Sequence, residues 1–216
     1  MNYDAIVKWS GVYLEGTWVL AKIFFLTLAF ALPLGLLIAV GRGSKNPFIW
    51  RIFHYYIAVF RGTPLILQLI VVFYAPSYIF GINLDRFAAA VMAFVFNYAA
   101  YFAEIYRGGI NSIPRGQYEA AQVLGFSRIQ TFLKIISPQM VKRIALPMSN
   151  EFTTLVKDTA LVSTLAVVEL YRSARNAAAA TTSIIPLFAA GAVYLVLNYF
   201  VTRFFIWFEK RLDYYR

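Results

Sequence analysis

Long apolar runs alternate with polar stretches along this chain, and the lengths of the runs indicate its class. Each run holds about 20 residues, which is what an α-helix needs to cross the hydrocarbon core of a bilayer. Five such runs predict an all-α membrane protein with five transmembrane helices, forming a single domain over residues 1–216. The predicted spans are residues 18–40, 64–80, 87–106, 145–168 and 185–208.

Residue types at the ends of the runs predict where helices begin and stop. Thr63 is placed to cap the second span, and Pro64 fits its first turn, where the missing amide donor is harmless. Residues 41–56 and 169–184 are expected to be loops. Residues 107–143 are too polar, and too often interrupted by proline and glycine, to cross the membrane.

The composition supports a membrane protein and excludes several kinds of chemistry. Only 14% of the residues are charged and 61% are hydrophobic, whereas a water-facing domain has about 25% charged residues. Without cysteine, and with His54 as the single histidine, the chain offers neither a disulfide framework nor a typical metal site. It has no phosphate-binding P-loop and no GxSxG or HExxH motif, so we expect no catalytic residues and no enzyme.

The net charge of +10 is distributed unevenly between the two sides of the predicted bundle. The connections on one side hold 12 lysines and arginines, and those on the other side hold 4. The first set is 41–56, 107–144 and 209–216, and the second is 1–17, 81–86 and 169–184. The positive-inside rule therefore predicts an external N-terminus, a cytoplasmic C-terminus and a cytoplasmic segment 107–143. Nucleic acid is not needed to explain the basic residues.

The fourth predicted span is unusually polar, because it contains Glu151, Lys157 and Asp158. Ionisable groups inside a membrane are costly unless they face a cavity or a partner. At about 100° per residue, Glu151, Thr154 and Asp158 fall on one stripe of the helix, which predicts a polar wall for a water-filled cavity. Alternatively, Lys157 neutralises an acid on a neighbouring helix, and the group only holds the bundle together.

Asn97 and Tyr101 on the third span are expected to face the same cavity. The candidate substrate-binding residues are thus Glu151, Asp158, Asn97, Thr154 and Tyr101. Glu151 and Asp158 are about 10 Å apart along the helix axis, too far to share a proton but suited to a ligand with separated positive groups. 

Two other charged positions near the ends of spans have simpler interpretations. Glu104 is expected to pair with Arg107, one turn further along the helix. Arg61 is expected to extend its charged group to the membrane surface.

Residues 119–138 contain a motif with fixed spacing: EAA, three residues, Gly, nine residues, Ile, one residue, Ser and Pro. This motif resembles the EAA loop of permease subunits of bacterial ABC importers, with Ser137 where leucine is usual. The segments FRGTPLILQL, EIYRGGINSIPRGQYEAA and LPMSNEFTTLVKDTALVS resemble the polar amino acid uptake branch of that family.

The resemblance implies a type I ABC importer fold, with five spans and a cytoplasmic coupling helix between the third and fourth. It places Glu119, Ala120, Ala121 and Gly125 at the contact with the ATPase: the alanines permit close approach to a groove, and Gly125 breaks the helix. The implied partners are a second permease subunit, cytoplasmic ABC ATPases that bind ATP and Mg, and an external binding protein. No cofactor is expected in this chain, which would be a multi-pass protein of the bacterial inner or plasma membrane.

The expected function is to form the translocation path of an ATP-driven amino acid importer by alternating access. The acid pair Glu151 and Asp158 favours a basic amino acid such as arginine, lysine or histidine. One alternative is another polar amino acid such as glutamine or glutamate. Others are an ion-coupled secondary carrier in which both acids titrate, or a scaffold that recruits a soluble partner through residues 107–143.

Overall fold

The computed structural model describes residues 3–212, and these form helices joined by short connections. The helices are α1 (Tyr3–Arg42), α2 (Pro47–Gly62), α3 (Leu65–Phe80), α4 (Arg86–Asn111), α5 (Arg115–Val123), α6 (Arg128–Thr131), the π-helical turn η1 (Phe132–Ile136), α7 (Ser137–Asp158), the 3₁₀ turn η2 (Thr159–Leu165), α8 (Leu170–Thr181) and α9 (Ile185–Arg211). The end of the predicted C-terminal connection, residues 213–216, lies outside the described residues.

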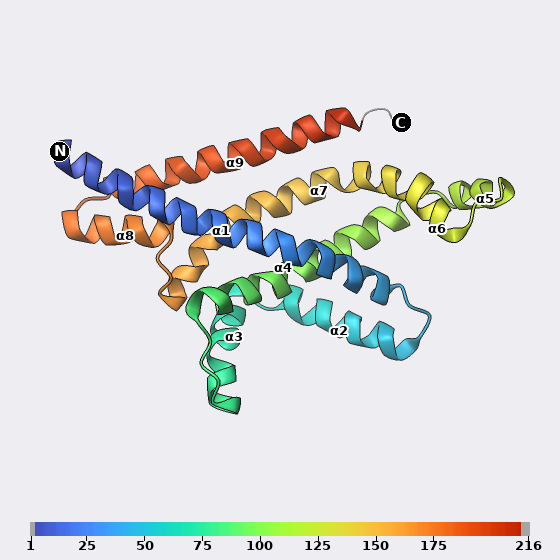
Figure 1. Cartoon of the computed structure of the whole chain (residues 1–216), viewed down its shortest axis with the longest axis horizontal. Helices are drawn as coiled ribbons and strands as arrows, with labels where there is room; N and C mark the ends of the chain where they lie inside the picture. The colour runs from blue at the N-terminus through green and yellow to red at the C-terminus, as the bar shows by residue number, and fades with distance from the viewer. Residues whose placement is uncertain (1–2, 213–216) are drawn as a thin grey trace.

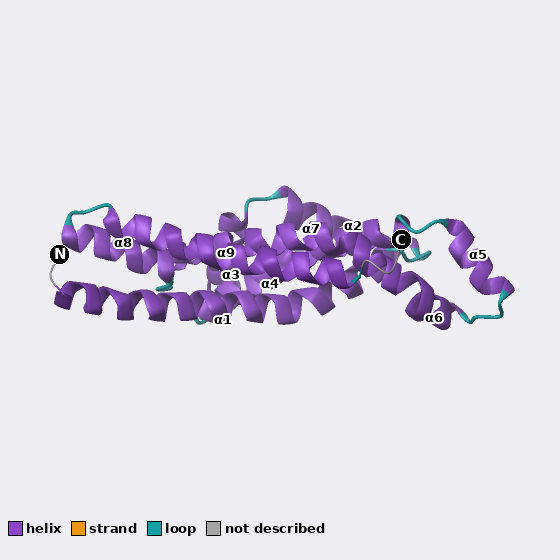
Figure 2. Cartoon of the chain, turned by 90° about the horizontal axis from the view of Figure 1, so that it is seen from above, coloured by secondary structure: helices purple, strands orange, loops and turns teal. Residues whose placement is uncertain are grey.

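The molecule is an elongated bundle in which α1, α4, α7 and α9 run along the long axis (Figure 1). Seen from above, the bundle is long and narrow, and α5 and α6 extend beyond one end of it (Figure 2). Helix α3 instead points away from the bundle (Figure 1). The middle of the polar segment 107–143, which forms α5 and α6, therefore lies beyond the ends of the long helices.

Three helices of the described residues are long and apolar enough to cross a membrane: Ser10–Arg42, Arg86–Asn111 and Ile185–Arg211. They contain the predicted spans 18–40, 87–106 and 185–208. A fourth candidate is the pair α2 and α3, which together have the required length and composition but are bent by 112°. Helix α7 is too polar to qualify, so the count of five spans stays a prediction.

The expected loop over residues 41–56 is wrong, because α2 begins at Pro47. Asn46 accepts a hydrogen bond from the Phe48 amide, and Pro47 occupies the first turn. A capping residue and a proline in the first turn are both typical of a helix start. Thr63 also differs from expectation. It ends α2 in an extended conformation, with its hydroxyl donating to the Val59 carbonyl, because a residue before proline avoids the helical region.

A buried polar network stabilises the corner between α2 and α3. Gln68, 7% exposed, donates through Nε2 to the Phe60 and Thr63 carbonyls and to the Thr63 hydroxyl, at 2.8–3.0 Å. Asn97 of α4 donates through Nδ2 to Gln68 Oε1 at 2.9 Å and to the Phe60 carbonyl at 3.1 Å. These bonds satisfy carbonyls left unpaired where α2 ends, so the sharp bend has no large hydrogen-bonding cost.

We expect Gln68→Leu to destabilise the protein by about 1–3 kcal/mol, because it removes the Gln68 donor from the Thr63 carbonyl and an acceptor from the buried Asn97 amide. The check is the unfolding temperature of the detergent-solubilised protein. Gln139→Leu is the matched control. Gln139 donates to the Gln117 side chain and the Ile135 carbonyl, which are partly exposed, so water can replace these hydrogen bonds. Equal unfolding temperatures for the two variants would contradict this role of Gln68.

The predicted span 145–168 and the predicted loop 169–184 also differ from the structure. The α-helix α7 ends at Asp158, the chain continues as η2, and Ala166 turns in the left-handed region. The expected loop is mostly the helix α8. Its start was missed because the capping residue is Glu169, which is fully buried and accepts hydrogen bonds from the Tyr171 and Arg172 amides and the Tyr194 hydroxyl.

Helices α1 and α4 form the most extensive helix contact of the described residues, and small side chains make it possible. Ala31 and Gly35 of α1 are one turn apart, as are Ala99 and Ala103 of α4. A Cβ added to Gly35 would lie 2.9 Å from Phe102 Cβ and 3.0 Å from the Ala99 carbonyl oxygen. Close backbone approach through small residues is the usual packing of membrane helices.

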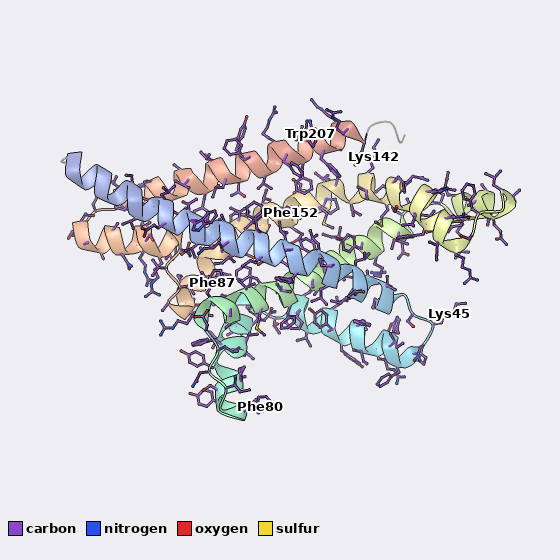
Figure 3. All side chains as sticks on the ribbon, in the orientation of Figure 1. Lys45, Phe80, Phe87, Lys142, Phe152 and Trp207 are labelled. Atoms are coloured by element: carbon purple, nitrogen blue, oxygen red, sulfur yellow. The ribbon has the colours of Figure 1, made fainter. Side chains whose placement is uncertain are left out.

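The outer faces of the bundle carry large apolar side chains. Trp207 points away from α9, whereas Phe152 lies among the helices (Figure 3). The Phe152 ring contacts Phe24, Phe102 and Phe205. On α9, apolar side chains such as Leu195 and Phe200 are well exposed, which suits lipid or another apolar surface and not water.

Candidate functional site

A cavity of about 270 Å³ lies where the corner of α2 and α3 faces α4 and α7. Its lining comes from these three places: residues 63–65 at the corner, Asn97, Tyr98 and Tyr101 on α4, and Glu151, Thr154 and Asp158 on α7. All five candidate substrate-binding residues thus line a single cavity. Its volume is slightly below the range of small-molecule sites, which is about 300–1,000 Å³.

The stripe on α7 forms one wall of this cavity, as the helical spacing predicts. Asp158 is held in place, because the Tyr98 hydroxyl donates to Asp158 Oδ2 at 2.8 Å. Tyr98 is only 1% exposed and stacks on Phe94. Sequence reasoning missed Tyr98, since a tyrosine in an apolar span looks like an ordinary core aromatic residue.

Asn97 lines the cavity but is already bonded on its donor side. Both of the acceptors for its Nδ2 group belong to the network at the corner, so the Asn97 amide nitrogen positions the cavity wall. The corner residues Thr63 and Pro64 were predicted to cap and open a helix, and not to line a cavity. The bend between α2 and α3 brings these residues to α4, and no local sequence pattern predicts such a bend.

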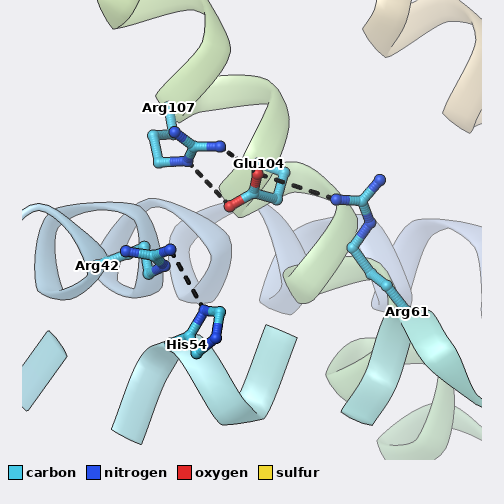
Figure 4. A network of polar contacts seen from close by, with 5 residues as sticks. All are labelled: Arg42, His54, Arg61, Glu104 and Arg107. Atoms are coloured by element: carbon cyan, nitrogen blue, oxygen red, sulfur yellow. Dashed lines mark hydrogen bonds and ion pairs between the residues drawn. The ribbon is translucent and has the colours of Figure 1, made fainter. Parts of the chain in front are cut away.

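An ion network lies one to two turns along α4 from the cavity (Figure 4). Arg107 donates to both carboxylate oxygens of Glu104, at 3.0 and 2.6 Å, which confirms the predicted pair. Arg61 Nη1 lies 3.9 Å from Glu104 Oε2, and its guanidinium stands 5.1 Å from the centroid of the Tyr101 ring. Beside this group, Arg42 and His54 are in contact at 3.3 Å.

The ion pairs of residues 3–212 do not include Lys157. The alternative that Lys157 neutralises an acid on a neighbouring helix therefore has no support from the geometry. Lys157 is exposed and does not line the cavity. Glu151 and Asp158 of α7 instead line the cavity opposite residues of α4 and of the α2–α3 corner, which is the arrangement expected of a binding wall.

The segment with the EAA motif forms the short helix α5, which ends as predicted. Gly125 has φ of +76°, a left-handed conformation that favours glycine, and the Phe126 amide donates to the Ala121 carbonyl across this turn. Glu119 and Ala120 are exposed. Ala121 is fully buried within the segment, so its side chain is not available for contact with a partner.

Two exposed apolar residues at the end of α5 were missed. Val123 is 87% exposed and Leu124 is 72% exposed, although they lie in a polar segment away from the apolar helices. Large apolar side chains concentrated on a protruding polar segment indicate a contact surface. The signal was present in the sequence, since both residues lie inside the EAA motif.

Beyond Gly125, the chain returns to the bundle through a second set of local interactions. Ser127 and Gln130 form a reciprocal capping box at the start of α6. The π-helical turn η1 then joins α6 to α7, and the Ser137 hydroxyl donates to the Leu133 carbonyl. Burial raises the pKa of Tyr118, which lines a second cavity of about 710 Å³ between α5 and this returning segment.

The family model for binding-protein-dependent transport system inner membrane components matches residues 31–214. An arginine transport system permease protein of Bacillus subtilis is 38% identical over 204 residues, which cover 94% of this chain and 93% of the relative. A putative glutamine transport system permease protein of Rickettsia felis is 36% identical over 184 residues, covering 85% and 84%.

A solved structure of an amino acid ABC transporter with histidines contains a chain of the same fold. Its TM-score to this structure is 0.87 at 32% sequence identity, and the match covers 98% of this chain and 99% of that one.

Proposed function

This chain belongs to the family of binding-protein-dependent transport system inner membrane components, and we propose that its cavity is a substrate site on the translocation path of an amino acid importer. The chain is a multi-pass membrane permease of an amino acid ABC importer. It is a transport subunit and not an enzyme, because ATPase activity in such systems belongs to a separate subunit. The observation that carries the proposal is the convergence of Glu151, Thr154 and Asp158 with polar groups of α4 in one cavity.

The proposed topology has five spans, of which two are irregular. The second is the bent pair α2 and α3, and the fourth is α7 with η2. The distribution of basic residues supports an external N-terminus, a cytoplasmic C-terminus and a cytoplasmic segment 107–143. In this orientation the exposed end of α5 faces the cytoplasm.

The proposed partners follow from the family and from the α5 surface. Glu119, Ala120 and the two exposed apolar residues Val123 and Leu124 contact a cytoplasmic ABC ATPase, which binds ATP and Mg. A binding protein delivers substrate on the external side, and a second permease subunit, identical or not, completes the path. Closure of the ATPases moves the α5 segments and switches the bundle between inward-open and outward-open states.

We assign a basic amino acid as the substrate class. Glu151 and Asp158 provide two carboxylates in one cavity, and positively charged groups form strong hydrogen bonds with carboxylates. One relative is named for arginine transport and another for glutamine transport, so the fold is compatible with either substrate class. The charge of the cavity favours the first. An ion-coupled carrier or a passive scaffold is not supported, because the family is one of binding-protein-dependent transport.

The test is substrate-stimulated ATPase activity of the assembled complex in liposomes. We expect Glu151→Gln to raise the concentration of arginine or lysine needed for half-maximal stimulation about 10-fold or more, since a charge-assisted hydrogen bond contributes roughly 1.5–3 kcal/mol. Glu209→Gln on α9, which removes the same charge at an exposed position outside the cavity lining, is the control. Unchanged stimulation by arginine and lysine would argue against the assignment. Stronger stimulation of the unaltered complex by glutamine would favour the other class.

A further inference from the structure

The acidic residues in the cavity lining can bind only the positive groups of an amino acid. These acids are Glu151 and Asp158, and both repel the α-carboxylate that every free amino acid carries. A site that prefers amino acids to simple amines therefore needs a cation within reach of the cavity. The ion network beside the cavity contains one that is suitably placed, and this inference rests on the proposed substrate site.

Arg61 stands at the border of the cavity. Its guanidinium lies 5.1 Å from the centroid of the Tyr101 ring, and Tyr101 is one of the lining residues. Arg61 also lies two residues before Thr63, which is another residue of the cavity lining. Its charge also acts on Glu151. The guanidinium therefore stands against a residue of the cavity lining, at the end of a long side chain.

The contact of Arg61 with Glu104 is weak. Glu104 already receives a hydrogen bond on each carboxylate oxygen from Arg107, at 3.0 and 2.6 Å. The contact from Arg61 is 3.9 Å, longer than a hydrogen bond. The Arg61 side chain is 43% exposed, and a guanidinium has five N–H donors in a fork that matches a carboxylate. Its donors are thus available to a second acid.

Lys157 is a less suitable cation than Arg61. Lys157 acts on Asp158, but it is exposed and outside the lining. From helical geometry it lies about 100° around α7 from the next residue, Asp158, which faces the cavity. An ammonium also offers a point charge and not a two-pronged contact.

We infer that Arg61 binds the α-carboxylate of the substrate and so makes the site specific for amino acids over the corresponding amines. In this arrangement the carboxylates on α7 hold the positive groups, and Arg61 holds the negative group at the opposite end of the ligand. Arg61 exchanges its long contact with Glu104 for a two-pronged one with the substrate. Glu104 stays paired with Arg107 throughout.

The experiment compares binding of L-arginine with binding of agmatine, which is arginine without its carboxylate. Binding is measured on the purified permease–ATPase complex without the binding protein, so that the permease site alone discriminates. We expect the unaltered complex to prefer arginine, and Arg61→Gln to reduce the ratio of affinities about 10- to 100-fold, mainly through weaker arginine binding. Arg61→Lys, which keeps the charge but loses the fork, should restore only part of the ratio.

Arg42→Gln is the matched control, because it removes an equal charge beside the same ion network, where Arg42 contacts His54 at 3.3 Å and does not line the cavity. It should leave the arginine-to-agmatine ratio unchanged. The inference is wrong if the unaltered complex binds both compounds equally, or if Arg61→Gln keeps the full preference. L-glutamine and its decarboxylated amine, 4-aminobutanamide, form a second pair. Tighter binding of glutamine than of arginine, with a preference over its amine that depends on Arg61, would uphold the inference while overturning the basic substrate class.

Discussion

Replacing Gly35 by leucine is expected to force α1 away from α4 and to destabilise the bundle by more than about 3 kcal/mol. The first added atom alone would lie 2.9 Å from Phe102 Cβ and 3.0 Å from the Ala99 carbonyl oxygen. The second of these is a backbone atom of a well-packed helix, so it cannot move aside as the end of a flexible side chain does. For a chain of this size, 3 kcal/mol corresponds to roughly 6–12 °C in unfolding temperature.

Gly191→Leu on α9 is the matched control for this variant. A Cβ at Gly191 has nothing within 4 Å, so the same change of residue adds no overlap. Thermal unfolding of the two purified variants in the same detergent gives the comparison. Similar unfolding temperatures would show that the α1–α4 contact is looser than the structure indicates.

An aspartate at Gly125 is expected to reduce transport by about 10-fold or more while leaving the protein in the membrane. Gly125 has φ of +76°, and a side chain there costs roughly 1–2 kcal/mol of backbone strain. A Cβ at this position has open space around it, so the effect comes from the backbone and not from overlap. The strain shifts α5 away from the geometry that presents Val123 and Leu124, and about 1.4 kcal/mol corresponds to a tenfold smaller docked fraction.

Gly116→Asp serves as the control, because Gly116 lies in the same helix with open space and an ordinary backbone conformation. Gly125→Asn provides a second comparison, since asparagine has the size and the left-handed tolerance of aspartate but no charge, and so separates backbone strain from charge. Substrate uptake into proteoliposomes, together with co-purification of the ATPase, measures the effect. Normal uptake by Gly125→Asp would remove the basis for treating α5 as the coupling element.

Helical periodicity made the α7 wall predictable. The stripe of Glu151, Thr154 and Asp158 depends only on the rotation per residue, so it required no knowledge of other helices. The long apolar runs of α1, α4 and α9 were equally clear. In the α2 region, charged residues such as Arg51 lower the apparent hydropathy, so the sequence pattern indicates a loop where the structure has a helix.

The other parts of the site required the three-dimensional arrangement. Gln68 and Tyr98 are important because the corner at Pro64 turns α3 and lets α4 approach, and no pattern along the chain encodes the direction of that turn. The EAA motif correctly placed the end of α5 at Gly125. It did not show that Ala121 faces inward while Leu124 faces outward, because that depends on how the returning segment folds against α5.

The polarity of α7 has a consequence for how the protein is made. A segment with Glu151, Lys157 and Asp158 close together would leave the protein-conducting channel for lipid only at a considerable free-energy cost. Helix α7 packs mainly against α9 and α4. We therefore expect α7 to remain in or beside the channel during synthesis until α9 has emerged, so that a chain truncated before α9 would be degraded instead of integrated.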